Sequence, residues 1–264
     1  MAEKKIHCHL APYFRSALFI KQHPVRFLLA FLSLYLFALA SYGQAVFGTE
    51  IIPASAFTKW VAATPKAYEG VYHFGESEAE SDFALVVSDG VITAQIRSGE
   101  WQTKPERWRK VYQTLTNVRI VGSKFYSKEA EGDFVIFSSE GKKTYGLRVG
   151  KPGSGSVDKE QLEVGARTGS LADYYDGDYP QASYKMLKTA ELSKYNKEQL
   201  LLMRNEVYAR YGYTFLKNEK LRLYFTKKEW YQAEQVALDL VLTPIEKKNL
   251  LTIQTAEAQV ALPK

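Results

Sequence analysis

Few side chains in this sequence could act as a nucleophile, a general base or a soft metal ligand. The histidines are His7, His9, His23 and His73, and the one cysteine is Cys8. A zinc-type site needs several imidazoles or thiolates close together, and thiol chemistry needs a cysteine in the folded part of the chain. Because four of these five residues precede position 24, little remains for such chemistry farther along.

His73 lies between Tyr72 and Phe74 in a predicted strand, a setting in which a lone histidine is usually structural. The sequence also contains no HExxH motif, no Walker loop and no GxSxG motif. We therefore predict that the protein is not an enzyme and that it has no catalytic residue, no metal and no cofactor.

Two acidic groups offer oxygen ligands for a cation such as calcium. The first is a short loop that contains Asp173, Asp176 and Asp178, but its spacing is not that of an EF-hand. The second group alternates in sequence just before a predicted strand, and we interpret it as a solvated acidic hairpin rather than a metal or glycosidase site. It comprises Glu76, Glu78, Glu80 and Asp82.

Aromatic and cationic side chains are better suited to binding than to catalysis. Flat rings bury the apolar faces of sugars, while phenol and indole groups still form hydrogen bonds. The candidate binding residues are Arg204, Tyr208, Arg210, Trp230, Tyr231, Tyr174 and Tyr175.

Each candidate also has a structural interpretation, which we favour for those on the helix. Glu206 and Arg210 are four residues apart in the order that favours an ion pair. Arg204 can lie beside a tyrosine one turn on, and the amide of Asn205 suits the backbone of the loop after Gly212. In that interpretation these polar residues lock the helix against its neighbours.

The aromatic candidates fall into two groups. The first is expected to form the core of a small helical domain, and it comprises Tyr224, Phe225, Trp230 and Tyr231. Aspartate and glycine residues surround the second group, which predicts an exposed loop. That group comprises Tyr174, Tyr175 and Tyr179.

The elements that must position these residues follow an N-terminal export signal. An uncharged apolar run over residues 27–40 follows a basic stretch, and Ala38 and Ala40 suit a signal peptidase, so we predict cleavage after Ala40, with Gln44 as a second site. The alternative is an uncleaved anchor, because the uncharged stretch continues to about Phe47. Both alternatives place the C-terminal bulk outside the cytoplasm. No cysteine ends the apolar run, so we do not expect a lipoprotein.

The net charge of +6 belongs largely to this leader. Residues 1–40 hold five of the 35 basic and one of the 29 acidic residues, so removing them leaves a charge of +2. Nucleic-acid binding requires a concentrated basic surface. We therefore predict no nucleic-acid partner, and membrane contact only through the N-terminal segment if it stays uncleaved.

Alternating apolar and polar residues over 67–150 predict an antiparallel β meander, either a sandwich or a partial barrel. Asp89-Gly90 suits a tight hairpin turn, and a second hairpin joins residues 134–137 to 144–147. Further strands are expected over 71–74, 116–121 and 124–127. Because Pro105 interrupts it, the stretch from Trp101 to Trp108 is expected to be a loop.

Helical patterns replace strand patterns after Tyr184. Asn196 and Gln199 form a capping box for a helix that ends before Gly212, and Thr243 starts a last helix that runs to about Ala258. The chain is thus predicted to be α+β. Its expected divisions are a leader (1–40), an N-terminal segment (41–66), a β domain (67–150), a poorly patterned linker or bridge (151–183), a helical domain (184–258) and a tail (259–264).

From within the first of those helices the sequence reads MRNEVYARYGYTF, starting at Met203, followed by a Tyr-Phe pair at 224–225 and a Trp-Tyr pair at 230–231. These blocks resemble the YARHG domain over roughly residues 184–257, with Tyr211 in place of the histidine of the family name and Ala233 where a proline commonly stands. The resemblance implies a bacterial extracellular module for which cell-wall binding has been suggested.

The expected function combines these features. We expect an exported, non-catalytic protein, periplasmic, envelope-associated or secreted, that binds or organises peptidoglycan or another envelope protein. One alternative is a hydrolase of wall glycan or peptide with paired carboxylates, which need no local motif. The other is a structural or assembly subunit without a small ligand.

Overall fold

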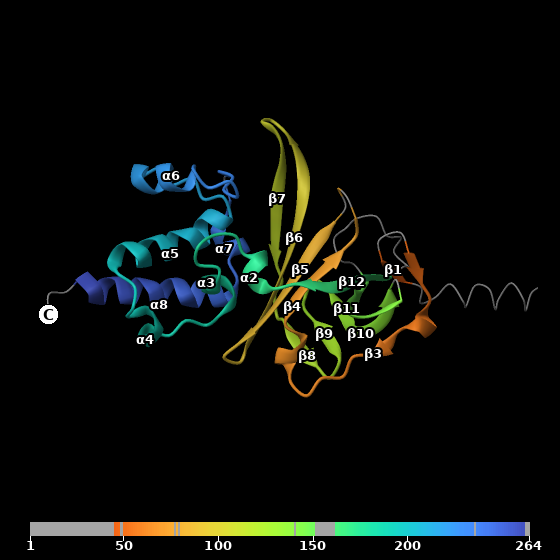
Figure 1. The fold of residues 1–264 in the computed structure, drawn as a ribbon. Coiled ribbons are helices and arrows are strands. Elements are labelled where there is room, and N and C mark those ends of the chain that lie inside the picture. The colour runs from red at the N-terminus through yellow and green to blue at the C-terminus, as the bar shows by residue number, and fades with distance from the viewer. Residues whose placement is uncertain are drawn as a thin grey trace, which may run out of the picture. The chain divides into compact units, whose positions relative to one another are not determined.

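The computed structural model describes residues 45–47, 50–76, 78, 80–139, 141–150, 162–234 and 236–261. They fall within one compact unit, Tyr42–Lys264, in which an antiparallel sheet is followed by helices (Figure 1). The predicted α+β class is confirmed. The predicted leader lies outside the described residues. Within the described residues, no helix is long and apolar enough to cross a membrane.

The described strands lie between Ala45 and Gly169. They are β1 (Ala45–Phe47), β2 (Glu50–Ile52), β3 (Thr58–Lys59), β4 (Gly70–Phe74), β5 (Ser81–Ser88), β6 (Val91–Thr103), β7 (Glu106–Thr114), β8 (Arg119–Val121), β9 (Lys124–Tyr126), β10 (Glu131–Ser139), β11 (Lys142–Val149) and β12 (Leu162–Gly169). Short 3-10 helices at Ala54–Ala56 and Pro65–Tyr68 separate the first of them.

The helices follow the last strand. They are α2 (Leu171–Tyr174), α3 (Gln181–Tyr184), α4 (Thr189–Leu192), α5 (Lys197–Arg210), α6 (Glu219–Phe225), α7 (Leu238–Val241) and α8 (Pro244–Ala261). Helices α5 and α8 run side by side (Figure 1).

One sheet contains the twelve described strands, and nine of them follow the order β7-β6-β5-β4-β12-β11-β10-β9-β8. Neighbours along this path are antiparallel. The N-terminal strands attach elsewhere: β1 pairs in parallel with β12, and β3 pairs with β10. Strand β12 therefore joins the two halves of the sheet.

Two predicted hairpins are confirmed. Asp89 and Gly90 form the turn between β5 and β6 with φ values of 46° and 76°, the positive values that such a turn requires. In the second hairpin, Phe134 of β10 faces Leu147 of β11. Strand β8 is shorter than the predicted strand at 116–121.

The expectation of a loop from Trp101 to Trp108 was wrong. These two tryptophans face each other across the distal part of the β6–β7 hairpin, which extends past the neighbouring strands (Figure 1). Pro105 lies in the turn between Thr103 and Glu106, where its missing N–H removes no ladder hydrogen bond. The proline therefore ends the strands rather than preventing them.

Strand β12 lies inside the segment that sequence analysis treats as a poorly patterned bridge. It pairs with both β4 and β11, and Gly165 faces the ring of Phe74, where an added Cβ would lie 2.4 Å from Cε2 of that ring. Because β12 needs a glycine at this contact, its sequence lacks the clear alternation of apolar and polar residues that predicts a strand. The predicted domain boundaries themselves stay a prediction.

The sheet curls around an aromatic core to which both halves contribute, including Tyr72, Phe83, Phe125 and Phe134. Alternate residues of β4 and β5 point away from this core. Val86 is one of these outward-pointing residues. They pack against the helices in a second cluster, which includes Leu171, Tyr174, Tyr175 and Ile245. The helical part therefore covers the outer face of β4–β6.

The two long helices begin as predicted. Asn196 and Gln199 form the capping box of α5, and Gly212 follows the helix with φ 82°. At the start of α8, the N–H of Glu246 donates to the hydroxyl of Thr243 at 3.2 Å, and the N–H of Thr243 donates to the carboxylate of Glu246 at 2.8 Å. Helix α8 ends at Ala261, slightly beyond the predicted end.

Candidate functional site

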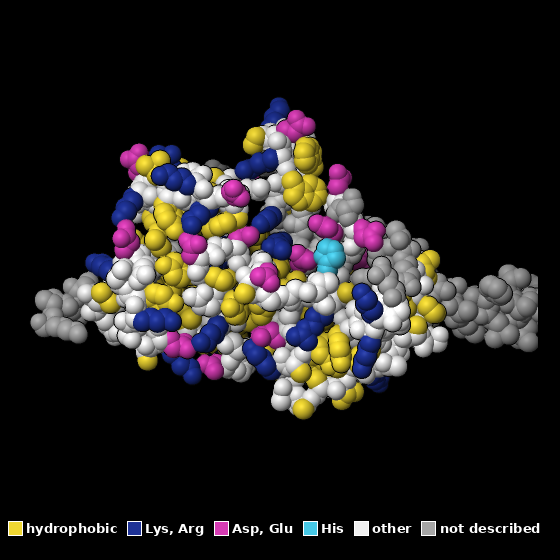
Figure 2. Space-filling view, viewed as in Figure 1, with side chains coloured by type: hydrophobic (Ala, Val, Ile, Leu, Met, Phe, Trp, Pro, Cys, Tyr) yellow, Lys and Arg dark blue, Asp and Glu magenta, His cyan; other side chains and the backbone are white. Residues whose placement is uncertain are grey.

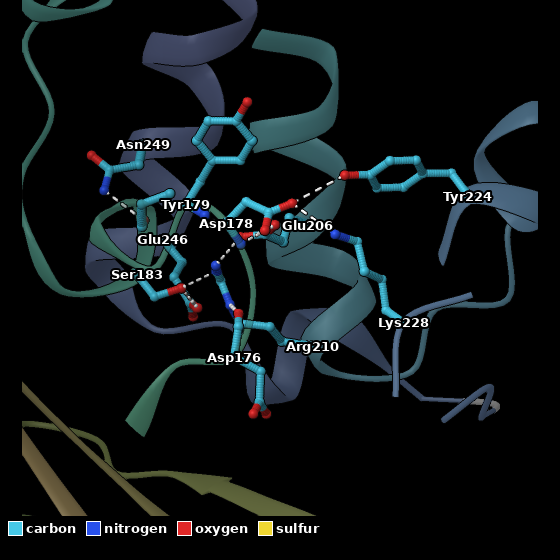
Figure 3. A network of polar contacts seen from close by, with 11 residues as sticks. Asp176, Asp178, Tyr179, Ser183, Glu206, Arg210, Tyr224, Lys228, Glu246 and Asn249 are labelled. Carbon is cyan, nitrogen blue, oxygen red and sulfur yellow. Dashed lines mark hydrogen bonds and ion pairs between the residues drawn. The ribbon is translucent and has the colours of Figure 1, made fainter. Parts of the chain in front are cut away.

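One buried carboxylate on α5 holds the loop that precedes α3. Glu206 accepts the backbone N–H of Asp178 at 2.8 Å and that of Tyr179 at 2.7 Å (Figure 3). Burial raises the pKa of the Glu206 carboxyl, and the guanidinium of Arg210 and the two backbone N–H groups offset part of that rise. Glu206 thereby fixes this loop against the helix.

Arg210, one helical turn along, is bonded in three directions. Its Nε donates to the carbonyl of Asp176 at 2.5 Å, Nη1 to the hydroxyl of Ser183 at 2.8 Å and Nη2 to Glu206 at 2.5 Å (Figure 3). The predicted ion pair between Glu206 and Arg210 is confirmed. All three guanidinium nitrogens therefore form hydrogen bonds within the helical part.

A second buried carboxylate connects this network to the sheet. Glu246 accepts the hydroxyl protons of Ser183 at 2.6 Å and of Tyr211 at 2.8 Å, and burial raises its pKa. The hydroxyl of Tyr211 in turn accepts the side-chain N–H of Gln95 on β6 at 2.9 Å. Tyr211, which replaces the histidine of the YARHG pattern, is thus one polar contact between helices and sheet.

In the part of the chain that the structure describes, Asn205 does not bond to the loop after Gly212, and the asparagine that satisfies backbone outside its own helix is Asn249 of α8, at a different place. Asn249 accepts the N–H of Leu187 at 2.8 Å and donates to the carbonyls of Ala182 and Lys185, each at 2.7 Å. Asn205 donates to the carbonyl at position 201 of its own helix at 2.7 Å. The expectation for Asn205 was wrong because its side chain lies along α5 rather than towards the loop after the helix.

The predicted binding residues do not share one site. Arg204 makes a two-bond ion pair with Glu257 of α8, with N···O distances of 2.6 and 3.1 Å. Tyr208 lies near Arg204 in a shallow depression away from the sheet. Trp230 and Tyr231 are half-buried and pack against Phe225. Of these residues, Trp230 joins Arg210 in the groove described below.

The exposure expected for Tyr174 and Tyr175 was wrong. Each side chain is 4% exposed, and the two rings meet edge to face beneath α8 residue Ile245. Tyr179 is half-buried against Tyr195. The Asp and Gly residues around them do form a loop, but the loop lies between the sheet and the helices, which a local pattern does not reveal.

A groove lies between strand β7 and the chain that follows α6. One wall is formed by six consecutive residues of β7, 109–114, and the other by the end of α5 and several residues between 230 and 241. Its volume is about 420 Å³, within the range typical of small-ligand sites. Figure 2 shows the surface hollowed between the hairpin and the helical part. We call this cavity the β7 groove.

The floor of the β7 groove is aromatic. Tyr112 of β7 meets Tyr211 edge to face, with ring centroids 4.9 Å apart. Trp230 stands on the opposite wall. Burial raises the pKa of the Tyr211 hydroxyl well above its usual range, so that group stays neutral. The groove therefore offers apolar ring surface with a fixed floor.

Charged side chains occupy the rim. Lys110 donates to the carboxylate of Asp176 at 2.8 Å, and Arg109 pairs with Glu100 and lies 3.9 Å from Glu234 across the groove. The Nε of Arg109 is buried and has no hydrogen-bond partner within the described chain. Sequence reasoning missed these β7 residues, although three cations and two aromatic residues within 107–112 are a signal that could have found them.

The histidine and the aspartates considered above have polar partners in the structure. His73 lies 2.9 Å from Asp82, whose other oxygen accepts from Arg97 at 2.8 Å, so the histidine belongs to a chain of partners along β4–β6. Among the described residues, no three His, Cys, Asp or Glu side chains are arranged to hold a metal ion. Asp176 and Asp178, considered above for calcium, pair instead with Lys110 and Lys228.

Comparison with protein families matches residues 175–258 to the YARHG domain. The predicted resemblance is confirmed for this segment. The match begins upstream of Tyr184, so it includes the loop and the Ser183 hydroxyl that bond to Glu206 and Arg210. No match was found among curated proteins or among solved structures. The YARHG domain is a module of extracellular and cell-envelope proteins.

Proposed function

We propose that this chain is an exported, non-catalytic protein of the bacterial cell envelope that binds or organises a wall component or an envelope protein through the β7 groove. The observation that carries the proposal is the joint construction of the groove, with one wall from the sheet and the other from the YARHG segment. Neither part alone would form it.

The contacts beneath the groove support a binding role, because they form a floor that needs no rearrangement. Gln95 bonds to Tyr211 and to the carbonyl of Val241, each at 2.9 Å, and the side-chain amide of Gln232 donates to the carbonyl of Trp108 at 3.2 Å. A pre-organised site loses less conformational entropy on binding than a mobile one.

The location is tested by expressing the chain with its leader in a bacterial host. The protein is expected to leave the cytoplasm and to lose about 40 residues, as the apolar run and its flanks predict. Cell fractionation with mass spectrometry of the N-terminus measures both. A full-length cytoplasmic product contradicts export. An intact N-terminus in the membrane fraction means that the leader anchors the protein and is not cleaved.

The binding role is tested with purified peptidoglycan and with detergent-extracted envelope proteins. We expect co-sedimentation with peptidoglycan or stable capture of one envelope protein, without release of muropeptides. Leu240→Glu should weaken binding, because Leu240 lines the groove and is 75% exposed. Leu216→Glu is the control, since Leu216 is 81% exposed and is not part of the groove.

Three results would count against this proposal. Release of muropeptides favours the carboxylate hydrolase. If both leucine variants bind equally well, the β7 groove is not the binding site. If the protein binds neither peptidoglycan nor an envelope protein, the structural-subunit alternative is favoured.

A further inference from the structure

The β7 groove runs along the edge of the sheet and not over one of its faces. Strand β7 is the last strand on its side of the sheet, with β6 as its pairing neighbour. Successive side chains of a strand point to opposite faces, so a cavity over one face would touch every second residue. Six consecutive residues, 109–114, line the groove. Residues of both parities therefore line it, as they do where a cavity runs along an edge strand.

The register fixes which backbone groups face the groove. The N–H of Leu115 donates to the carbonyl of Ala94 at 2.9 Å, so Leu115 and every second residue before it turn their backbone groups towards β6. The intervening residues, which include Lys110 and Tyr112, turn theirs away from β6. The same parity applies to Trp108, and its carbonyl does accept a bond from the far side of the groove.

The backbone groups of Lys110 and Tyr112 on that side are open. In the described chain, no hydrogen bond reaches the N–H or C=O of either residue from across the groove. Unpaired N–H and C=O groups on a strand edge are a template for a further strand, and several peptide-binding domains use such an edge. Here the template lies within a recess that would enclose the added chain.

One cation of the lining selects the kind of chain. Lys110 and Arg210 are already paired with Asp176 and Glu206, whereas Arg109 pairs with Glu100 through Nη2 alone. The buried Nε of Arg109 has no acceptor among the described residues and would gain one from a carboxylate. A glycan lacks the regular alternation of N–H and C=O groups that an open strand edge pairs with.

We propose that an extended, acidic peptide segment of a partner protein binds in the β7 groove by pairing with β7 as an additional strand. This inference rests on the proposed function and names its partner class. The pairing bonds supply affinity, and contact of an Asp or Glu side chain with Arg109 supplies selectivity.

The test uses a phage-displayed library of random linear peptides, selected on the full chain, and then a selected peptide made synthetically. Selected peptides should be enriched in Asp and Glu. Lys110→Pro removes the outward N–H at an edge position that tolerates proline. Lys110→Thr is the matched control, because both variants lose the bond to Asp176. The proline variant should bind the peptide at least about tenfold more weakly than the threonine variant.

A second measurement does not depend on either variant. In the unsubstituted protein, the backbone amides of Lys110 and Tyr112 should exchange with solvent more slowly by NMR once the synthetic peptide is bound. Those of Val111 and Gln113 should change little, because they already face β6.

Four outcomes overturn the inference. They are equal binding by folded proline and threonine variants, unchanged exchange at positions 110 and 112, selection of peptides without acidic residues, and failure to select any peptide. One combination separates the two proposals. If no peptide binds, but the protein still co-sediments with peptidoglycan and Leu240→Glu weakens that co-sedimentation, strand addition is wrong and the proposed function stands. If no material binds at all, both fail.

Discussion

Gly177 lies directly against the carboxylate of Glu206. A Cβ added at Gly177 would come 2.3 Å from Cδ of Glu206, and the backbone at this glycine has φ 114°. Only a residue without a side chain lets the loop approach α5 closely enough for Glu206 to accept two successive backbone N–H groups. The buried carboxylate and the glycine therefore depend on each other.

Gly177→Ala should lower the free energy of unfolding by roughly 2–4 kcal/mol, because the left-handed backbone is strained and the displaced carboxylate loses hydrogen bonds. Gly90→Ala is the matched control: its φ is 76° and no atom lies within 4 Å of the added Cβ. That change should cost about 1–2 kcal/mol. Urea unfolding of both variants measures the difference, and equal losses would contradict the close contact.

Asn249→Ala should destabilise the protein more than Asn205→Ala. The first change leaves one N–H and two carbonyls of the α3–α4 connection without their partner, a loss of roughly 1–3 kcal/mol. The second removes one bond along α5 and replaces asparagine by a better helix former, so about 1 kcal/mol or less is expected. Thermal unfolding compares the two, and the reverse order would refute this assignment.

Tyr211→Phe tests the link between helices and sheet. Loss of the hydroxyl leaves Gln95 and Glu246 each with one partner fewer in a buried setting, so the free energy of unfolding should fall by about 1–3 kcal/mol. Tyr213→Phe is the control, because Tyr213 is 42% exposed, and it should change stability by less than about 0.5 kcal/mol. Matching effects from the two changes would show that the hydroxyl of Tyr211 contributes little.

Glu246 should make stability depend on pH. An unperturbed glutamate has a pKa of about 4.3, and burial raises the pKa of Glu246 in the folded state. Between those two pKa values the folded state binds more protons than the unfolded state. The stability contributed by this group is therefore fully present below about pH 4.3 and is lost as pH rises through the folded pKa.

Glu246→Gln cannot titrate, which isolates this effect. The unfolding free energy of the parent minus that of the variant should fall with rising pH, by about 1.4 kcal/mol for each unit by which the folded pKa is raised. Chemical denaturation of both proteins over roughly pH 4–8 measures it. A difference that stays constant or grows with pH would contradict the direction.

Local signals predicted much of the fold. The Asp89-Gly90 turn and the capping boxes at Asn196 and Thr243 each depend on residues within a few positions, and all were found where expected. Strand β12 could not be predicted in the same way. Its place between β4 and β11 depends on partners far along the chain, and the glycine that admits Phe74 weakens its own pattern.

The candidate site was less predictable for the same physical reason. The contact from Gln95 to Tyr211 joins residues that no sequence window contains together. Likewise, Tyr174 and Tyr175 are buried because α8 and the sheet cover their loop, whereas composition alone indicated exposure. The Glu206–Arg210 pair was predictable because both residues lie on one face of one helix.

The pairing of β4 with β12 also has a kinetic consequence. His73 of β4 faces Ala166 of β12, so the centre of the sheet can form only after a long stretch of chain has closed on itself. Contacts so distant in sequence slow folding, because the entropy of loop closure is lost before the new contacts compensate for it. Until residues 162–169 arrive, the strands β4–β7 would present an open edge at β4. That interval is when the chain is most exposed to pairing with other molecules.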